Sequence, residues 1–298
     1  MDIPHSPPCL RCGAPSREWR VPADRHGGEA REVRACTSAV CGIAFTWPQF
    51  SGMTEAAPAA GELSVVGGAV AARMAAASVA RLGAVMPRGS LVVDVGAGTG
   101  LRAKALAKMG FAVVAIEPDA VEEERAHVEL AGTGVEVHRA GVDDLADVLD
   151  GRVADAVVMW HVLEHLPTPD AALAQIGQCL RGGGVLNIAV PNRSSLEASV
   201  FGNRWHAWEP SRHRWHYDEH ALRLVLGEAG FSVNEISPRG GWGYPSSLAF
   251  SLAPRLDPQV HPRRGVPGRL LAAAMIPVAL GARAVGRGGQ LVTLARRI

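Results

Sequence analysis

Hydrophobic and polar positions alternate in a regular way from Leu91 onward. Short runs rich in Val and Ile are separated by longer stretches in which apolar residues recur with the period of a helix. Strands are predicted over residues 91–95, 112–116, 135–138, 154–160 and 185–190, and helices over 100–109, 119–131 and 170–180. Strands that alternate with helices in this way form a parallel, doubly wound sheet with right-handed crossovers. We therefore expect an α/β domain.

The pattern continues after Asp218, where an amphipathic stretch ends at Gly230, a residue typical of helix C-termini. Residues 232–237 and 290–295 are two further strand candidates. Between them, residues 238–289 form a long insertion in the predicted sheet.

The first part of the chain has a different pattern. Residues 1–50 show no helical period and hold four of the five cysteines. Residues 51–62 are small and polar, as in a linker, and the Ala-rich stretch 65–86 predicts one helix or two short ones. We therefore divide the chain into a module over 1–50, a linker and helical lead-in over 51–90, and a main domain over 91–298.

The composition is that of a globular protein, with 48% hydrophobic and 20% charged residues. The charge is balanced, with 30 basic and 29 acidic residues, which disfavours general nucleic-acid binding. Pro, Cys and Arg interrupt the start of the chain where a signal peptide would be apolar, so we expect a cytoplasmic protein. The longest apolar stretch, 270–282, is broken by Pro277 and Gly281 and is shorter than the ~20 residues of a membrane span.

A glycine-rich loop follows the first predicted strand. In VVDVGAGTG (92–100), Gly96, Gly98 and Gly100 let the backbone turn sharply and approach a ligand closely. The second strand ends at Glu117-Pro118, where a doubly wound fold places a carboxylate for ribose hydroxyls. Leu101 stands where a dinucleotide-binding loop has its third glycine, which disfavours NAD and FAD. The loop and the acid together predict another adenosine-type ligand.

With this loop the sequence resembles the class I S-adenosylmethionine (SAM)-dependent methyltransferases, whose first motif is Asp-x-Gly-x-Gly-x-Gly. The resemblance covers about residues 90–237 and includes Asp143-Asp144, WHVLEHL at 160–166, LRGGG at 180–184 and VPN at 190–192. It implies a Rossmann-like doubly wound sheet of seven strands, the last one antiparallel, with SAM as cofactor. It implies cofactor contacts at Asp94, Gly96, Ala97, Gly98, Gly100, Glu117, Pro118, Asp143 and Trp160.

Methyl transfer from a sulfonium needs an aligned acceptor and, for an oxygen or nitrogen acceptor, a group that takes a proton. His161, Glu164 and His165 follow the fourth strand, and residues 201–220 hold four of the eleven histidines and three of the seven tryptophans. We favour His213 or His165 as the base. The resemblance implies that 201–220 covers the acceptor, with contacts at Trp205, His206, Trp208, Trp215, His216 and Tyr217. The alternative is that these aromatic residues anchor a long loop.

The favoured reaction is methylation of a small molecule at oxygen, on a natural product, a sugar or a quinone-like compound. A C-methyltransferase and a non-catalytic zinc-containing binding protein are the alternatives. A methyltransferase acting on RNA is disfavoured by the balanced charge, although arginines in 193–223 and 263–269 could form a local basic face.

Some related enzymes, including ubiquinone-pathway O-methyltransferases and small-RNA 3′-end methyltransferases, bind a divalent ion through Glu-x-x-Glu-His, in one case with a downstream histidine. Here the run is His161-x-x-Glu164-His165, with His213 downstream. Imidazole replaces the first carboxylate, and a nitrogen-rich site is less suited to Mg²⁺. We therefore favour deprotonation by histidine over a catalytic metal.

The clustered cysteines have the spacing of a structural zinc site. Cys9-x2-Cys12 and Cys36-x4-Cys41 can supply four thiolates to one zinc ion. A short module with few aliphatic residues needs such a crosslink to fold. The pattern Cys41-Gly42…Pro48 resembles the cysteine ribbon that precedes the methyltransferase domain in one bacterial branch of the family.

The insertion offers two further features. The turn-like segment 240–245 would bring Trp242 and Tyr244 back to the acceptor pocket. Residues 269–287 are apolar and studded with arginine, so they pack on the core, form a dimer contact or rest on a membrane surface.

Overall fold

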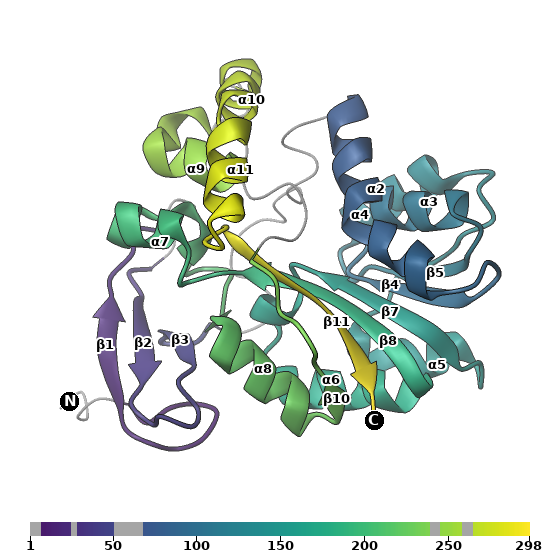
Figure 1. Cartoon of the computed structure of the whole chain (residues 1–298), viewed down its shortest axis with the longest axis horizontal. Helices are drawn as coiled ribbons and strands as arrows, with labels where there is room; N and C mark the ends of the chain where they lie inside the picture. Colours follow the sequence, from purple (N-terminus) through teal and green to yellow (C-terminus); the bar gives the residue numbers. More distant parts are fainter. Residues whose placement is uncertain (1–6, 25–28, 51–67, 239–244, 258–264) are drawn as a thin grey trace.

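The main sheet has seven strands, as the sequence pattern and the family resemblance predict (Figure 1). The computed structural model describes residues 7–24, 29–50, 68–238, 245–257 and 265–298. In spatial order the strands are β10 (Phe231–Ser232), β11 (Gln290–Arg297), β8 (Leu180–Pro191), β7 (Ala154–Trp160), β4 (Leu91–Val95), β5 (Ala112–Ile116) and β6 (Glu136–His138). β11 runs antiparallel to both β8 and β10, while β8, β7, β4, β5 and β6 are parallel. The predicted Rossmann-like fold class is confirmed.

Helices cover both faces of this sheet because successive strand residues point to opposite sides. Val92 packs in one buried cluster with α2 (Gly68–Val85), α3 (Leu101–Lys108) and α4 (Ala120–Leu130). Val93 packs in the other with α5 (Leu145–Leu149), α6 (Pro169–Cys179) and α8 (Glu219–Glu228). The winding on two faces follows from the predicted right-handed crossovers.

Two strand boundaries differ from the predictions. The strand expected over 185–190 begins earlier, at Leu180, and takes up the extra residues in a bulge where Ala154 pairs with Leu180 and Ala156 with Val185. The strand expected over 232–237 is reduced to β10 and an isolated bridge from Ser237 to Val292. The carbonyls of Val233 and Glu235 instead accept hydrogen bonds from the side chains of Arg223 and Thr293.

The amino-terminal cysteines belong to a second, antiparallel sheet. Its strands are β1 (Ser16–Arg20), β2 (Glu32–Cys36), β3 (Ala44–Trp47) and β9 (Trp215–His216), in that order. β9 comes from the segment after β8, and it pairs Phe45 with Trp215 and Ala44 with His216. Ile43 and Phe45 are buried in the same apolar cluster as α6 and α8. The cysteine module therefore shares both a sheet and a core with the main domain. The expected linker at 51–62 lies outside the described residues.

The insertion is helical and stands beside the start of β11 in Figure 1. It contains α9 (Pro245–Leu252), the short 3₁₀ helix η5 (Pro254–Leu256), α10 (Gly265–Ala274) and α11 (Ile276–Ala284). The apolar stretch expected over 270–282 is thus part of a longer helical span, 266–284, which is long and apolar enough to cross a membrane by length and composition alone. α2 meets the same test, but it packs on the sheet through Val79 and Leu82.

Candidate active site

The glycine loop begins directly after β4, at the carboxyl end of the central strand. Gly100 caps α3 in a left-handed conformation (φ 81°), and a Cβ there would lie 2.7 Å from Leu130 Cδ1, so only glycine fits. A Cβ on Gly98 (φ 54°) would meet no described atom within 4 Å. The loop is therefore closed toward α4 and open on the side of Gly98, where a ligand can approach the backbone.

Glu117 follows β5 and faces this loop. Its carboxylate oxygens accept hydrogen bonds from the backbone N–H of Gly98 at 2.8 Å and of Asp119 at 3.0 Å. A carboxylate has about four lone-pair positions, so two remain for hydroxyl donors such as those of a ribose. Burial raises the pKa of Glu117, and the two N–H donors oppose this by stabilising the charged form.

Asp94 is the buried acid of the loop. Burial raises its pKa to about 7, the charge of Arg102 lowers it and the charge of Glu117 raises it. Its Oδ2 has no hydrogen-bond partner within the described part of the chain. A buried, unpartnered carboxylate oxygen beside an open glycine loop fits the positively charged donor groups of SAM.

Two further cofactor candidates, Trp160 and Asp143, differ in their surroundings. Trp160 ends β7 and is buried, with Arg102 stacked 5.1 Å from its ring and its Nε1 donating to Asn187 Oδ1 at 3.3 Å. Asp143 is exposed on a 3₁₀ turn, η1 (Val142–Asp144), after β6. Arg102 therefore connects Asp94 of the loop with Trp160, whereas Asp143 lies at the rim of this end of the sheet.

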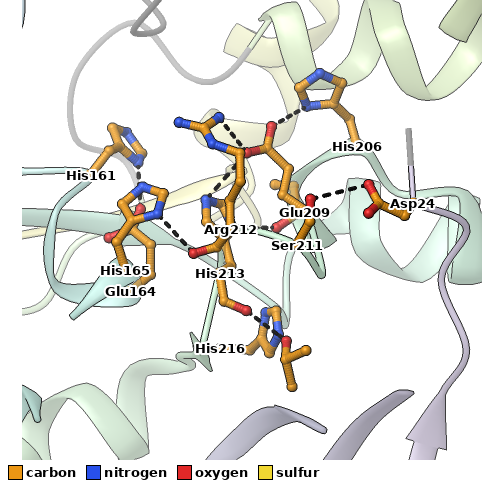
Figure 2. A network of polar contacts seen from close by, with 12 residues as sticks. Asp24, His161, Glu164, His165, His206, Glu209, Ser211, Arg212, His213 and His216 are labelled. Carbon is orange, nitrogen blue, oxygen red and sulfur yellow. Dashed lines mark hydrogen bonds and ion pairs between the residues drawn. The ribbon is translucent and has the colours of Figure 1, made fainter. Parts of the chain in front are cut away.

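The residues predicted as candidate proton acceptors lie close together after β7 (Figure 2). His161 Nδ1 lies 3.2 Å from Glu164 Oε1, and its Nε2 lies 3.1 Å from Gln290 Oε1 at the start of β11. His165 Nδ1 donates to the Arg212 carbonyl, and the ring centroids of His165 and His213 are 4.7 Å apart. The segments after β7 and after β8, separated in sequence, thus form one cluster of His161, Glu164, His165 and His213.

This cluster adjoins the cofactor loop. β7 pairs with β4, so that Asp94 lies beside Val158 and both strands end at the same edge of the sheet. Val162 fills the space on Gly96, where a Cβ would lie 2.6 Å from Val162 Cγ2. A methyl donor on the loop and an acceptor against the histidines would therefore be neighbours.

Three donor atoms of the cluster have the arrangement of a metal site. One ligand atom from each of Glu164, His165 and His213 lies within 4.8 Å of the others. The Nδ1 of His165 and of His213 each donates to a backbone carbonyl, which leaves both Nε2 atoms as acceptors. Glu164 is fully buried, and its Oε2 has no hydrogen-bond partner among the described residues. This donor set fits a divalent cation that accepts imidazole, such as Zn²⁺ or Mn²⁺, better than Mg²⁺.

The cluster also includes Glu209, a residue that the sequence pattern did not predict. Glu209 lies between His213 and the insertion, with its Oε2 2.8 Å from Arg212 Nη1 and 3.6 Å from His213 Nε2 (Figure 2). Its Oε1 is 3.9 Å from His206 Nδ1, and His206 Nε2 is 3.2 Å from Asp257 Oδ2. Glu209 has a positive φ of 34°, which no sequence motif announces.

The aromatic residues expected at the acceptor are instead packed inside the protein. Trp205, Trp208 and Trp215 are buried, and their indole N–H groups donate to Glu197, to the Gly202 carbonyl and to the Leu166 carbonyl. Such satisfied indoles favour the alternative that they anchor the loop. His206, His216 and Tyr217 are also buried, and the Tyr217 hydroxyl has no hydrogen-bond partner in the described part of the chain. Trp242 and Tyr244 lie outside the described residues.

The four amino-terminal cysteines converge as their spacing predicts. The Sγ atoms of Cys9 and Cys41 are 4.0 Å apart, those of Cys12 and Cys36 are 3.5 Å apart, and all four lie within 4.8 Å of one another. Tetrahedral coordination with Zn–S bonds of about 2.3 Å places sulfurs about 3.8 Å apart. Backbone N–H groups hydrogen-bond to each sulfur, which stabilises thiolates. The cysteine geometry fits a structural zinc ion.

Comparison with known proteins identifies the family. Residues 69–236, more than half of the chain, match a family model described as a methyltransferase domain. The chain is 31% identical over 159 residues to the ubiquinone biosynthesis O-methyltransferase of Xanthomonas axonopodis pv. citri (strain 306), covering 51% of this chain and 66% of the relative. It is 27% identical over 169 residues to the protein of the same name from Azorhizobium caulinodans, covering 52% and 66%. The chain thus spans just under two thirds of the length of these relatives.

Solved structures agree on the fold. The cyclase SpnF has a TM-score of 0.52 at 22% identity, covering 76% of this chain and 80% of that one. The magnesium protoporphyrin IX methyltransferase of Synechocystis PCC 6803, with bound SAH (S-adenosylhomocysteine), has a TM-score of 0.50 at 18% identity, covering 76% and 83%. The sheet and the glycine loop define a class I SAM-binding fold. With the family match, the chain belongs to the class I SAM-dependent methyltransferases.

Proposed function

We propose that this protein transfers a methyl group from SAM to an oxygen of a small-molecule acceptor. The observation that carries the proposal is that the loop open at Gly98, beside an Asp94 Oδ2 with no partner among the described residues, adjoins the cluster of His165 and His213. The names of the similar O-methyltransferases support oxygen as the acceptor atom. A quinone-like, sugar or natural-product hydroxyl is the acceptor class that we infer.

The residues of this chain would supply alignment and a proton acceptor. SAM, when bound, supplies a methyl group already activated by the sulfonium charge. The loop, Glu117 and Asp94 would hold the donor, while His165 and His213 would hold the acceptor hydroxyl at their Nε2 atoms. Burial lowers the pKa of His165 to about 3 and that of His213 to about 4, so both imidazoles are neutral at neutral pH and each Nε2 lone pair can accept a hydrogen bond from the hydroxyl.

A cation-assisted version is a second candidate, favoured by the convergence of Glu164, His165 and His213. A general base works best when its pKa is near the working pH, and imidazoles with such low pKa values are weak bases for a hydroxyl. A divalent cation at these atoms would lower the pKa of a bound hydroxyl. In this candidate, the replacement of the first glutamate of Glu-x-x-Glu-His by His161 would change which metal ion is preferred, and the metal site itself would be retained.

The test is turnover of SAM with a panel of phenolic, sugar and carbon acceptors, measured as SAH formed and as the position of the new methyl group. Methylation at oxygen supports the proposal, and methylation at carbon would establish the alternative. Binding of SAH without turnover on any acceptor would favour the non-catalytic binding protein. If neither SAM nor SAH binds in calorimetry, both enzyme proposals are wrong.

We also propose a structural metal site, a division of the chain into domains and a contact surface. We propose that Cys9, Cys12, Cys36 and Cys41 hold structural zinc. We keep the division into residues 1–50, 51–90 and 91–298, with the strand exchange through β9 as an added connection. Residues 269–287 are proposed as a contact surface, with a second copy or a membrane surface as its candidate partners.

A further inference from the structure

The helices α10 and α11 present an apolar face that the rest of the protein leaves uncovered. Val266 and Leu270 on α10 are 69% and 67% exposed. Val278 on α11 is 50% exposed, and Val285, which directly follows α11, is 68% exposed. These positions are spaced as one side of a helix, and only 22% of the 266–284 span is buried. The expectation that residues 269–287 pack on the core is therefore not met by most of this surface.

The same region is strongly basic. Residues 245–287 contain six arginines (255, 263, 264, 269, 283 and 287), no lysine and a single acid, Asp257. Arg269 and Arg287 are exposed, while Asp257 is fully buried against His206. The balanced charge of the whole chain thus conceals a surface that combines exposed aliphatic side chains with the exposed Arg269 and Arg287.

This combination selects between the two candidate partners. A second copy of the chain would bring like charges together across the apolar face, which costs free energy. An anionic lipid bilayer supplies both an apolar layer and negative headgroups, the pairing that interfacial amphipathic helices use. We propose that α10 and α11 bind the surface of an anionic membrane.

The helices would lie on the membrane rather than cross it. Ala272 of α10 packs with Ala249 and Phe250 of α9, so the start of the span is fixed on the protein. At its other end, the Arg287 carbonyl accepts from the backbone N–H of Leu196, just before β11 enters the main sheet. Both ends of the span are therefore held by the same folded body. A crossing helix would have to place them on opposite sides of a bilayer.

The membrane surface also bears on the acceptor, if the proposed function is correct. α9 contacts the segment that carries the active-site histidines, because Ser251 Oγ accepts from the His206 backbone N–H at 2.7 Å and the rings of Phe250 and His206 are 5.4 Å apart. An acceptor with a lipid-like tail would reach the site from the membrane beside α9. The structure thus narrows the proposed substrate class to amphiphilic hydroxyl compounds.

The test is co-sedimentation of the full chain with vesicles of phosphatidylcholine, alone or with about one third phosphatidylglycerol. We expect binding to the anionic vesicles that weakens with salt. Arg269→Gln should lower the partition coefficient about fivefold, and Leu270→Gln about tenfold. Val128→Gln is the matched control, because Val128 is an apolar residue of α4 that is 73% exposed, and it should bind like the wild type.

Unaltered thermal unfolding of the variants will show that they fold. Absence of vesicle binding, or equal binding by Val128→Gln and Leu270→Gln, would overturn the membrane proposal. A concentration-dependent dimer in sedimentation velocity that Leu270→Gln dissociates, without vesicle binding, would assign the face to a second copy. SAH binding is measured on the same samples without vesicles, so failure of the methyltransferase proposal is seen separately.

Discussion

The side-chain hydroxyl of Thr46 donates a 2.6 Å hydrogen bond to the backbone carbonyl of His213. The same hydroxyl lies 3.0 Å from His216 Nε2, and the Thr46 backbone N–H donates to the Arg214 carbonyl. On its other side, this stretch is held by Glu164, whose carbonyl accepts from the Arg214 N–H. The cysteine module thus fixes the backbone that carries His213 against the loop after β7.

Removing the Thr46 hydroxyl should therefore change the position of His213 and leave SAM binding at the glycine loop unchanged. We expect Thr46→Val to lower kcat by about tenfold to hundredfold, because small misplacements of a reacting group have effects of this size. The affinity for SAH should change less than about twofold, since the glycine loop does not contact Thr46. Thr46→Ser, which keeps the hydroxyl, should restore kcat. A loss of SAH affinity in Thr46→Val, or no rescue by serine, would contradict this positioning role.

The Cys cluster should determine whether the second sheet is stable. We expect about one zinc per chain in the purified protein and loss of that zinc in Cys36→Ser, with a melting temperature lower by roughly 10 °C. Cys179→Ser is the control, because this cysteine lies in α6, apart from the four. Elemental analysis and thermal unfolding are the measurements. Full stability of a zinc-free preparation would show that the thiols are not ligands.

Asp94 should make SAM binding depend on pH. Its pKa is raised to about 7 by burial, so the carboxyl is neutral below that pH and anionic above it. A positively charged ligand prefers the anion, and we expect the affinity for SAM to fall as the pH drops from about 8 to 6. Asp94→Asn should weaken binding by about tenfold or more and remove the pH dependence. Calorimetry across this range checks it, with Asp147→Asn as the comparison, because Asp147 is exposed on α5 and is not among the expected cofactor contacts.

The course of the main chain was largely predictable, whereas the composition of the site was only partly so. Strand patterning located β4, β5 and β7, because buried parallel strands need unbroken apolar runs. The pairing of β3 with β9 was not predictable, since two-residue strands leave no periodic signal. Glu209 and Gln290 were missed for a related reason. Gln290 reaches His161 across 129 positions of the chain. Glu209 is only four residues from His213, but no motif marks it and its contact depends on a backbone with positive φ.

The tryptophans show how a sequence pattern leaves two interpretations open. The sequence predicts acceptor contacts at Trp205, Trp208 and Trp215, because a polar segment rich in indoles is typical of a binding surface. Trp208 instead packs between Trp19 of the cysteine module and Trp205, with ring centroids 5.4 Å and 4.9 Å apart. In this structure the indole rings pack against other parts of the same chain. A sequence pattern does not distinguish a ligand from another part of the protein.

The second, cation-assisted candidate predicts that turnover depends on a metal ion held by Glu164, His165 and His213. We expect removal of weakly held metal by a chelator to lower turnover more than tenfold, and Mn²⁺ or Zn²⁺ to restore it better than Mg²⁺. Glu164→Gln should abolish the restoration while the zinc of the cysteine cluster is retained, so elemental analysis separates the two sites. If neither the chelator nor added metal changes turnover, the cation-assisted candidate is wrong, and the histidines act without a metal ion.

The buried histidines should also make the fold sensitive to mild acid. His165 and His213 have pKa values lowered by burial to about 3 and about 4, while in the unfolded chain they titrate near 6.5. Between about pH 6.5 and 4 the unfolded chain therefore binds more protons than the native protein, so stability is full above this range and is lost as the pH falls through it. Each such group contributes a slope of about 1.4 kcal/mol per pH unit. Urea unfolding of chelator-treated protein should show this slope, and His213→Gln should reduce it by about one group. A stability that is flat over the range would mean that these imidazoles are already protonated, or exposed, in the native protein.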